Sequence, residues 1–235
     1  MPPSKLRRLK HWKVKLMLNP TYDALETIEE KVRYIKSHMG GCSLAVCLDD
    51  YNLNRIEDLT KLAIRHKCHL RFNRLYNGGA MPGYVERYGV AMHKALDLLL
   101  NSDFVIWPNF IMESTTFTWN SPKNPNFCGK CFIAVDPNGT IRSCNADPDV
   151  KIGSIFTTTP KISELTFSHR WSCKNIPECT GCEWSTWCQG GCPYTRKLAF
   201  GTYDKRTPFC GVFKELFPKL QKIKERWIEK HGLDS

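Results

Sequence analysis

The stretch that decides the fold of this chain is residues 179–192, which read CTGCEWSTWCQGGC. Four of these positions are cysteine, in the spacing C-x2-C-x5-C-x3-C, and a further cysteine, Cys210, follows after seventeen residues. Cys128 and Cys144 lie upstream of this stretch. Counted from Cys128 to Cys210, the segment holds nine of the chain's twelve cysteines. Four cysteines at preset distances from Cys179 arise by chance with a probability of roughly 10⁻⁵. The array therefore indicates a chemical role for the thiols.

The rest of the chain favours a metal role over disulfides. The basic segment 5–10 is not followed by an apolar run long enough for a secretory signal, and no stretch is long enough to span a membrane. We therefore expect the cytoplasm, where thiols stay reduced, and no membrane association. Iron–sulfur clusters need four soft thiolates around one small volume, and Gly190-Gly191 allows a close backbone approach. Zinc accepts four thiolates at similar spacings and remains the alternative.

The net charge of +11 does not by itself predict a nucleic-acid function. Basic residues are scattered along the chain except in the first fifteen positions, which we interpret as a solvated edge.

The first half alternates between strand and helix patterns. Strands are expected at 12–18, 43–48 and 69–76, and helices at 29–36, 56–66 and 84–100, with residues 49–52 as a break. This order predicts an α/β fold with a parallel sheet, and three such units are too few to close a barrel. Arg71, Asn73 and Arg74 end the third strand, the end that faces the active site in αβ barrels. They either line an exposed face or contact a cofactor or substrate.

The second half has a different character. Residues 109–127 are rich in Thr, Asn, Ser and Pro and are interpreted as a linker. Residues 131–135 and 140–144 flank a turn at 136–139 and predict a β-hairpin, and residues 213–230 predict a helix. The expected domains are therefore 1–108, a linker at 109–127, and 128–235.

The complete array resembles the SPASM domain, the auxiliary-cluster domain of many radical SAM peptide-modifying enzymes. That pattern is C-x9–15-G-x4-C, a gap, then C-x2-C-x5-C-x3-C-x17-C, and Cys128, Gly139 and Cys144 meet its first part. The upstream βα units are similar to the later part of the radical SAM barrel. The resemblance implies the C-terminal part of a partial (β/α) barrel, followed by a small cysteine-rich SPASM domain with a hairpin and a C-terminal helix.

The resemblance also implies two auxiliary 4Fe-4S clusters. The first would use Cys128, Cys144 and Cys192, with Cys131 either as the fourth ligand or as a neighbour that leaves an iron open. The ligands of the second would be Cys179, Cys182, Cys188 and Cys210. The remaining cysteines are expected to be structural or small buried hydrophobes: Cys42, Cys47, Cys68 and Cys173.

Two features depart from the family. The C-x3-C-x2-C motif that holds the SAM-cleaving cluster does not occur in the 235 residues, and Asn145 stands where sulfatase-maturing members have Asp. We therefore expect a truncated or split protein, incomplete and inactive alone, with S-adenosylmethionine bound only if an N-terminal half is supplied. No catalytic residue is assigned.

The resemblance implies the cluster-binding portion of an oxidoreductase that modifies peptides or proteins. Its partners would be a peptide or protein substrate, a radical SAM half or partner chain, and an electron donor such as flavodoxin or ferredoxin. The alternatives are a non-enzymatic electron-transfer or substrate-binding subunit and a zinc-stapled binding protein.

Overall fold

The computed structural model of the protein describes residues 2–11, 16–105, 134–157 and 173–232. Its parallel sheet has the order β1-β2-β3, formed by β1 (Met17–Leu18), β2 (Ser43–Leu48) and β3 (His69–Arg74). Strands β2 and β3 pair over six residues, from Ser43↔His69 to Leu48↔Arg74. The predicted α/β class is confirmed at this level.

The three predicted helices are present, and α1, α3 and the 3-10 turn η1 are additional. The helices of this part are α1 (Pro3–His11), α2 (Leu25–Met39), α3 (Asp50–Asn54), α4 (Ile56–Arg65), the 3-10 turn η1 (Tyr76–Ala80) and α5 (Tyr84–Leu100). Helix α1 was not predicted. The expected break at 49–52 is confirmed, since β2 ends at Leu48. Helix α3 was not predicted; it begins there because the Asp49 carboxylate accepts a hydrogen bond from the Asn52 backbone N–H at 2.8 Å.

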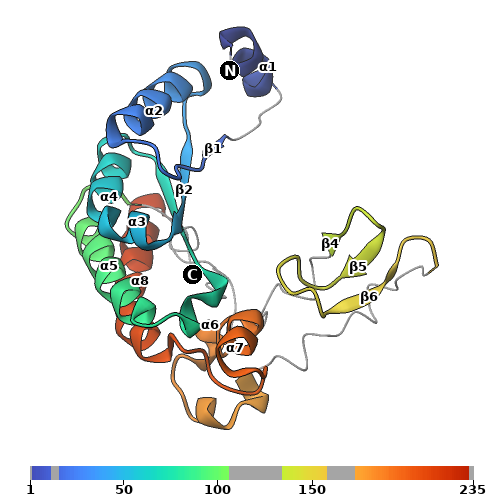
Figure 1. The fold of residues 1–235 in the computed structure, drawn as a ribbon. Helices are drawn as coiled ribbons and strands as arrows, with labels where there is room; N and C mark the ends of the chain where they lie inside the picture. The colour runs from blue at the N-terminus through green and yellow to red at the C-terminus, as the bar shows by residue number, and fades with distance from the viewer. Residues whose placement is uncertain (1, 12–15, 106–133, 158–172, 233–235) are drawn as a thin grey trace. The chain divides into compact units, whose positions relative to one another are not determined.

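The two faces of the parallel sheet differ in polarity. Helices α2, α4 and α5 are stacked along one side of this sheet (Figure 1). Leu44, Val46, Leu70 and Phe72 are at most 1 % exposed and share one face, which we infer to be the helix-covered one. Because strand residues alternate between faces, Arg71 and Asn73 lie on the opposite face and are partly exposed. The sheet therefore has one apolar, helix-covered face and one polar face.

The Tyr84 side chain forms hydrogen bonds at the carboxyl ends of both β2 and β3. Its hydroxyl donates to the Leu48 carbonyl at 2.6 Å and accepts from the Leu75 N–H at 3.1 Å. Burial raises the pKa of this phenol to about 12. Gly78 leaves room for the ring, since a Cβ at that position would lie 2.3 Å from a ring carbon of Tyr84. A single side chain thus satisfies two backbone groups where the strands end.

The chain divides into two units. The first comprises Met1–Gly78, Pro82–Glu113 and Lys214–Ser235, and the second comprises Gly79–Met81 and Ser114–Phe213. Helix α8 (Cys210–His231) contains the predicted helix 213–230. Within the first unit, the Arg226 guanidinium on α8 donates to the backbone carbonyls of Leu99, Leu100 and Ser102 at the end of α5.

The second unit contains the predicted hairpin. Strands β4 (Ala134–Val135) and β5 (Thr140–Arg142) pair antiparallel, and β6 (Lys151–Ser154), which was not predicted, pairs with β5. Gly139 supplies the left-handed turn residue at φ +82°. The unit also holds short helices not predicted from the sequence: η5 (Cys173–Asn175), η6 (Pro177–Cys179), α6 (Ser185–Cys188) and α7 (Pro193–Phe200).

Parts of the expected organisation fall outside the described residues. These are positions 12–15 of the first expected strand, 131–133 of the hairpin and the linker 109–127. The boundaries 1–108, 109–127 and 128–235 stay a prediction. Among the described helices, none is long and apolar enough to cross a membrane.

Replacing Tyr84 by Phe tests the link between the strand ends. Tyr84→Phe leaves two buried backbone groups without their partner, so we expect the free energy of unfolding to fall by about 1–3 kcal/mol. Tyr22→Phe, at a side chain that is 71 % exposed, serves as the control and should change it by less than about 0.5 kcal/mol. Equal effects of both substitutions in urea denaturation would contradict this role.

Candidate metal centre

Short turns place the cysteines of residues 179–192. The Cys182 N–H donates to the Cys179 carbonyl at 3.2 Å, so the C-x2-C segment forms one tight turn. Helix α6 ends at Cys188, whose N–H donates to the Trp184 carbonyl at 2.8 Å. Cys192 then caps α7, which begins with Pro193, a residue suited to the first helical position.

A left-handed segment joins these two helices. Gln189, Gly190 and Gly191 have φ values of +51°, +77° and +77°. A Cβ at Gly191 would lie 2.6 Å from the Thr207 Cβ, while the Gly190 carbonyl accepts the Thr207 N–H at 3.1 Å. The glycines therefore fulfil the expected role, because both backbone conformation and crowding exclude larger residues next to Cys192.

Negative charge on other predicted ligands affects the pKa of two thiols, those of Cys188 and Cys179. Burial, followed by negative charge on Cys210, Cys179 or Cys182, raises the pKa of the Cys188 thiol to about 12, while the Gly190 N–H opposes the shift. Burial also raises the pKa of the Cys179 thiol, as does charge on Cys173, Cys210 or Cys182. The set assigned to one cluster by the resemblance consists of Cys179, Cys182, Cys188 and Cys210.

Cys144 belongs to a different neighbourhood. Burial raises the pKa of its thiol, the backbone N–H groups of Ala146 and Asp147 oppose this by donating to the sulfur, and charge on Cys192 raises the pKa. Cys144 and Cys192 are two of the ligands assigned to the other cluster. The remaining two positions of that set, Cys128 and Cys131, lie outside the described residues.

A buried arginine stands beside the thiols of both sets. The Arg196 side chain on α7 is 0 % exposed, and its guanidinium donates to the Lys205 carbonyl at 3.3 Å. Burial lowers the pKa of this guanidinium, and negative charge on Cys192, Cys179 or Cys188 opposes the shift. Sequence reasoning missed Arg196. Its position four residues after Cys192, one turn along a helix, is the signal that would have found it.

Soft thiol donors are the ligands that a metal group with several thiolates requires. Thiolates bound to such a group would add negative charge near the Arg196 guanidinium, to which Asp204 also contributes. The raised pKa values at Cys179 and Cys188 mean that a bound cation is needed to hold these sulfurs deprotonated at neutral pH. Within the described ranges, no three His, Cys, Asp or Glu side chains converge as ligands of a single metal ion.

Asp147 organises the chain around Cys144. It is 1 % exposed, and its carboxylate accepts hydrogen bonds from the Tyr203 hydroxyl at 2.6 Å and from the Lys197 ammonium at 3.0 Å. Lys197 also pairs with Asp149. Asn145, in contrast, is exposed. The Asp147 carboxylate is thus buried three residues after Cys144, whereas Asn145, directly after the cysteine, carries no carboxylate.

The other singled-out residues are distributed as follows. Cys173 is buried, and its thiol donates to the Gln189 side-chain oxygen at 3.5 Å. The rings of Trp184 and Trp187 meet edge to face, 5.3 Å apart. Residues Arg71 and Asn73 lie on the polar face of the sheet, where the Arg71 Nε donates to the Asn73 Oδ1 at 2.9 Å. Arg74 is buried on the opposite face, so the structure does not bring all three together.

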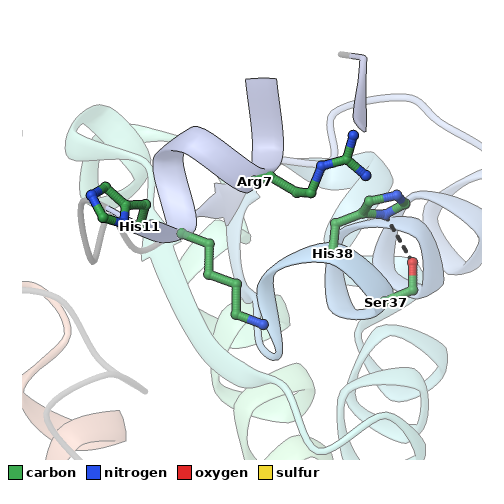
Figure 2. A pocket seen from close by; sticks show the side chains of 5 residues that line it. Arg7, His11, Ser37 and His38 are labelled. Carbon is green, nitrogen blue, oxygen red and sulfur yellow. Dashed lines mark hydrogen bonds between the residues drawn. The ribbon is translucent and has the colours of Figure 1, made fainter. Parts of the chain in front are cut away.

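A cavity of about 500 Å³ in the first unit contains no thiol (Figure 2). It is lined by Arg7, Lys10 and His11 of α1 and by Ser37 and His38 of α2. The hydroxyl of Ser37 contacts the His38 Nδ1 at 2.9 Å. The basic N-terminal segment, interpreted from its sequence as a solvated edge, thus lines one side of this cavity. Lys10, His11 and His38 sit in the last turns of their helices, where positive charge offsets the helix dipole.

Comparison with known proteins identifies a fold. No family model matches the chain, and no curated protein matches it. The fold and the thiol array define a mixed α/β protein with a cysteine-rich unit. Two solved structures share this fold: native anSMEcpe with bound AdoMet and Cp18Cys peptide, and native anSMEcpe with bound AdoMet.

Both neighbours are remote in sequence. Each has a TM-score of 0.67 and covers 96 % of this chain and 73 % of its own, with identities of 17 % and 16 % respectively. The neighbour anSMEcpe is a radical SAM/SPASM sulfatase-maturating enzyme. At this identity the likeness shows the shared fold, and what the neighbours bind is a property of those proteins.

Two glycines that directly precede cysteines provide a matched test of the left-handed segment. Gly181→Ala places a Cβ in open space at φ +70°, so only backbone strain of about 1–2 kcal/mol is expected. Gly191→Ala adds contact with Thr207 and should cost a further ~1–3 kcal/mol. The measurement is denaturation followed by tryptophan fluorescence. Equal losses for the two variants would contradict the close packing beside Cys192.

Proposed function

We propose that this chain is the iron–sulfur cluster-binding portion of a radical SAM/SPASM oxidoreductase that modifies peptides or proteins. One observation carries the proposal. Negative charge on Cys182 and Cys210 raises the pKa of both the Cys179 and the Cys188 thiols, and the sequence pattern assigns these four residues to a single cluster; charge on Cys173, outside the set, also acts on Cys179. The shared fold of anSMEcpe supports the same class.

In this proposal the chain binds two iron–sulfur clusters. Cys179, Cys182, Cys188 and Cys210 would bind one 4Fe-4S cluster, while Cys144 and Cys192 would bind another together with Cys128 and, as a fourth ligand or neighbour, Cys131. When bound, the clusters would supply one-electron transfer or an anchoring iron for the substrate. The backbone N–H groups of Ala146 and Asp147 donate to the Cys144 sulfur, a contact that raises the reduction potential of a bound cluster.

Arg196 has a defined part in this arrangement. Its buried cation acts on Cys192, which belongs to one ligand set, and on Cys179 and Cys188, which belong to the other. A positive charge shared by two anionic sites favours their reduced states, because each added electron is placed near the guanidinium. We infer that Arg196 positions the thiolates and sets the reduction potentials.

A second candidate is a non-enzymatic subunit that transfers electrons or binds a peptide. In both candidates S-adenosylmethionine binds only with a radical SAM half, and a peptide substrate and a flavodoxin or ferredoxin donor are the proposed partners. Arg71 and Asn73, on the polar sheet face, are the proposed cofactor or substrate contacts, and Arg74 was predicted with them.

Iron content of matched cysteine variants tests the two-site partition. Reconstitution of the full chain with iron and sulfide under anaerobic conditions should give a brown protein with about eight irons. Cys188→Ala and Cys192→Ala, only four positions apart, should each leave about four irons, and the double variant should leave nearly none. Cys47→Ala, in strand β2, is the control and should retain all of them.

Two results would contradict the partition. A colourless protein that binds two zinc ions would replace the clusters with zinc sites. A double variant with as much iron as either single variant would place Cys188 and Cys192 in one site.

Arg196 variants test the electrostatic role. Arg196→Met removes the buried charge and should lower the reduction potentials by on the order of 50 mV, measured by redox titration with electron paramagnetic resonance. Arg196→Lys keeps the charge and should shift them less. Arg206→Met removes an exposed charge in the same unit and is the control, since solvent screens that charge. An equal shift in Arg196→Met and Arg206→Met would show that burial of the charge does not matter.

A further inference from the structure

Two thiols outside the cysteine array lie against each other in the first unit. The Sγ atoms of Cys42 and Cys68 are 3.3 Å apart, and the side chains are 7 % and 0 % exposed. Cys42 directly precedes β2 and Cys68 directly precedes β3. Because the strands pair from Ser43↔His69 onward, the two preceding residues are neighbours as well. Although the sequence separates them by 26 positions, the parallel register makes them a pair.

The backbone of this pair suits a covalent bond. Neighbouring strands lie about 4.8 Å apart, which falls within the ~4.4–6.8 Å range of Cα separations found across disulfides. A disulfide joins its sulfurs at about 2.05 Å, so the two Sγ atoms need to approach by only about 1.3 Å. Side-chain rotation can supply this movement, and the strand pairing can remain intact.

The surroundings of the pair distinguish the two thiols. The Lys36 ammonium of α2 donates to the His66 carbonyl, two residues before Cys68. The hydrogen bond from Cys68 lowers the pKa of the Cys42 thiol, burial opposes this, and the Lys36 charge lowers it further. The same hydrogen bond and burial raise the pKa of the Cys68 thiol. Cys42 is also the more exposed of the two, so a small disulfide in solvent reaches it first.

We propose that Cys42 and Cys68 form a reversible disulfide when the folded chain meets a low-molecular-weight disulfide such as oxidised glutathione. The Cys42 thiolate attacks one glutathione sulfur, forms a mixed disulfide and expels the first glutathione thiolate. Cys68 then loses its proton and attacks the Cys42 sulfur, and the second glutathione thiolate leaves. Two protein thiols are oxidised, one glutathione disulfide is reduced, and the two protons are carried by two molecules of reduced glutathione.

The bond would change the stability of the first unit. It closes a loop of 26 residues that contains the whole of β2 and α4, and such a closure restricts the unfolded chain. Cys42 and Cys68 continue the alternation of Leu44 and Leu70 on the helix-covered face, so the cross-link leaves the polar face of the sheet unchanged. The pair would thus stabilise the folded first unit only in its oxidised form. This inference does not depend on the proposed function.

Thiol mapping of the full chain tests the proposal. The protein is equilibrated anaerobically in glutathione buffers from fully reduced to fully oxidised, free thiols are blocked with N-ethylmaleimide, and the digest is analysed by mass spectrometry. The expected product is a peptide pair joined through Cys42 and Cys68, two hydrogens lighter than the separate peptides, while Cys47 carries the blocking group. Blocked Cys42 and Cys68 in the oxidised buffer, or equal oxidation of Cys47, would overturn the proposal.

Single variants test the order of attack. In Cys68→Ala, Cys42 should accumulate as the mixed disulfide with glutathione, whereas in Cys42→Ala, Cys68 should remain free and become blocked. Cys47→Ala, the matched control on β2, should form the cross-link as the unsubstituted chain does. A mixed disulfide on Cys68 rather than on Cys42 would overturn the assignment of the attacking thiol.

A thermal readout completes the test without a substituted protein. Oxidation of the unsubstituted chain should raise the Tm of the first unit by several degrees, and reduction with dithiothreitol should reverse the rise. A cross-link that forms without any rise in Tm would show that it does not stabilise the folded unit, and the proposed redox-dependent stabilisation would fail.

Discussion

The parallel pairing of β2 with β3 is the constraint on which the first unit depends. Its six-residue register fixes which side chains share a face. Leu44, Val46, Leu70 and Phe72 are thereby turned toward the helices, while Arg71 and Asn73 are turned toward the polar face. The same register places Tyr84 where its hydroxyl can bond at both strand ends, and it brings Cys42 beside Cys68 at the opposite ends.

The second unit is built around backbone turns rather than a long sheet. The left-handed segment Gln189–Gly191 separates Cys188 from Cys192: charge on Cys210 and Cys179 acts on Cys188, whereas charge on Cys192 acts on Cys144. Arg196, one turn further along α7, is buried, and charge on thiols of both sets acts on it. A buried cation beside thiols of raised pKa is an arrangement that a metal group with thiolate ligands would satisfy.

Much of the regular structure could be predicted because its local signals agree with its packing. The strand at 43–48, the helix at 84–100 and the hairpin around 136–139 were predicted with nearly the observed bounds. The misses have local causes. Asp49 was correctly interpreted as ending the strand, but its second role as the cap of α3 was missed, and α6 and α7 are too short for a periodic pattern to emerge. Strand β6 forms by pairing with β5, and its own residues carry no pattern that predicts a strand.

The sequence by itself determined the composition of the candidate site. The spacing of Cys179, Cys182, Cys188, Cys192 and Cys210, and the glycines beside them, carry the chemistry of soft ligands and tight turns, since both depend on residue type and chain distance alone. Tertiary structure decided which distant groups meet. Arg196 became a partner of the thiols through burial, Arg74 was separated from Arg71 and Asn73 by strand alternation, and Cys42 met Cys68 through strand register. Contacts of this kind depend on how elements pack in three dimensions, and the order of residues along the chain does not encode them separately.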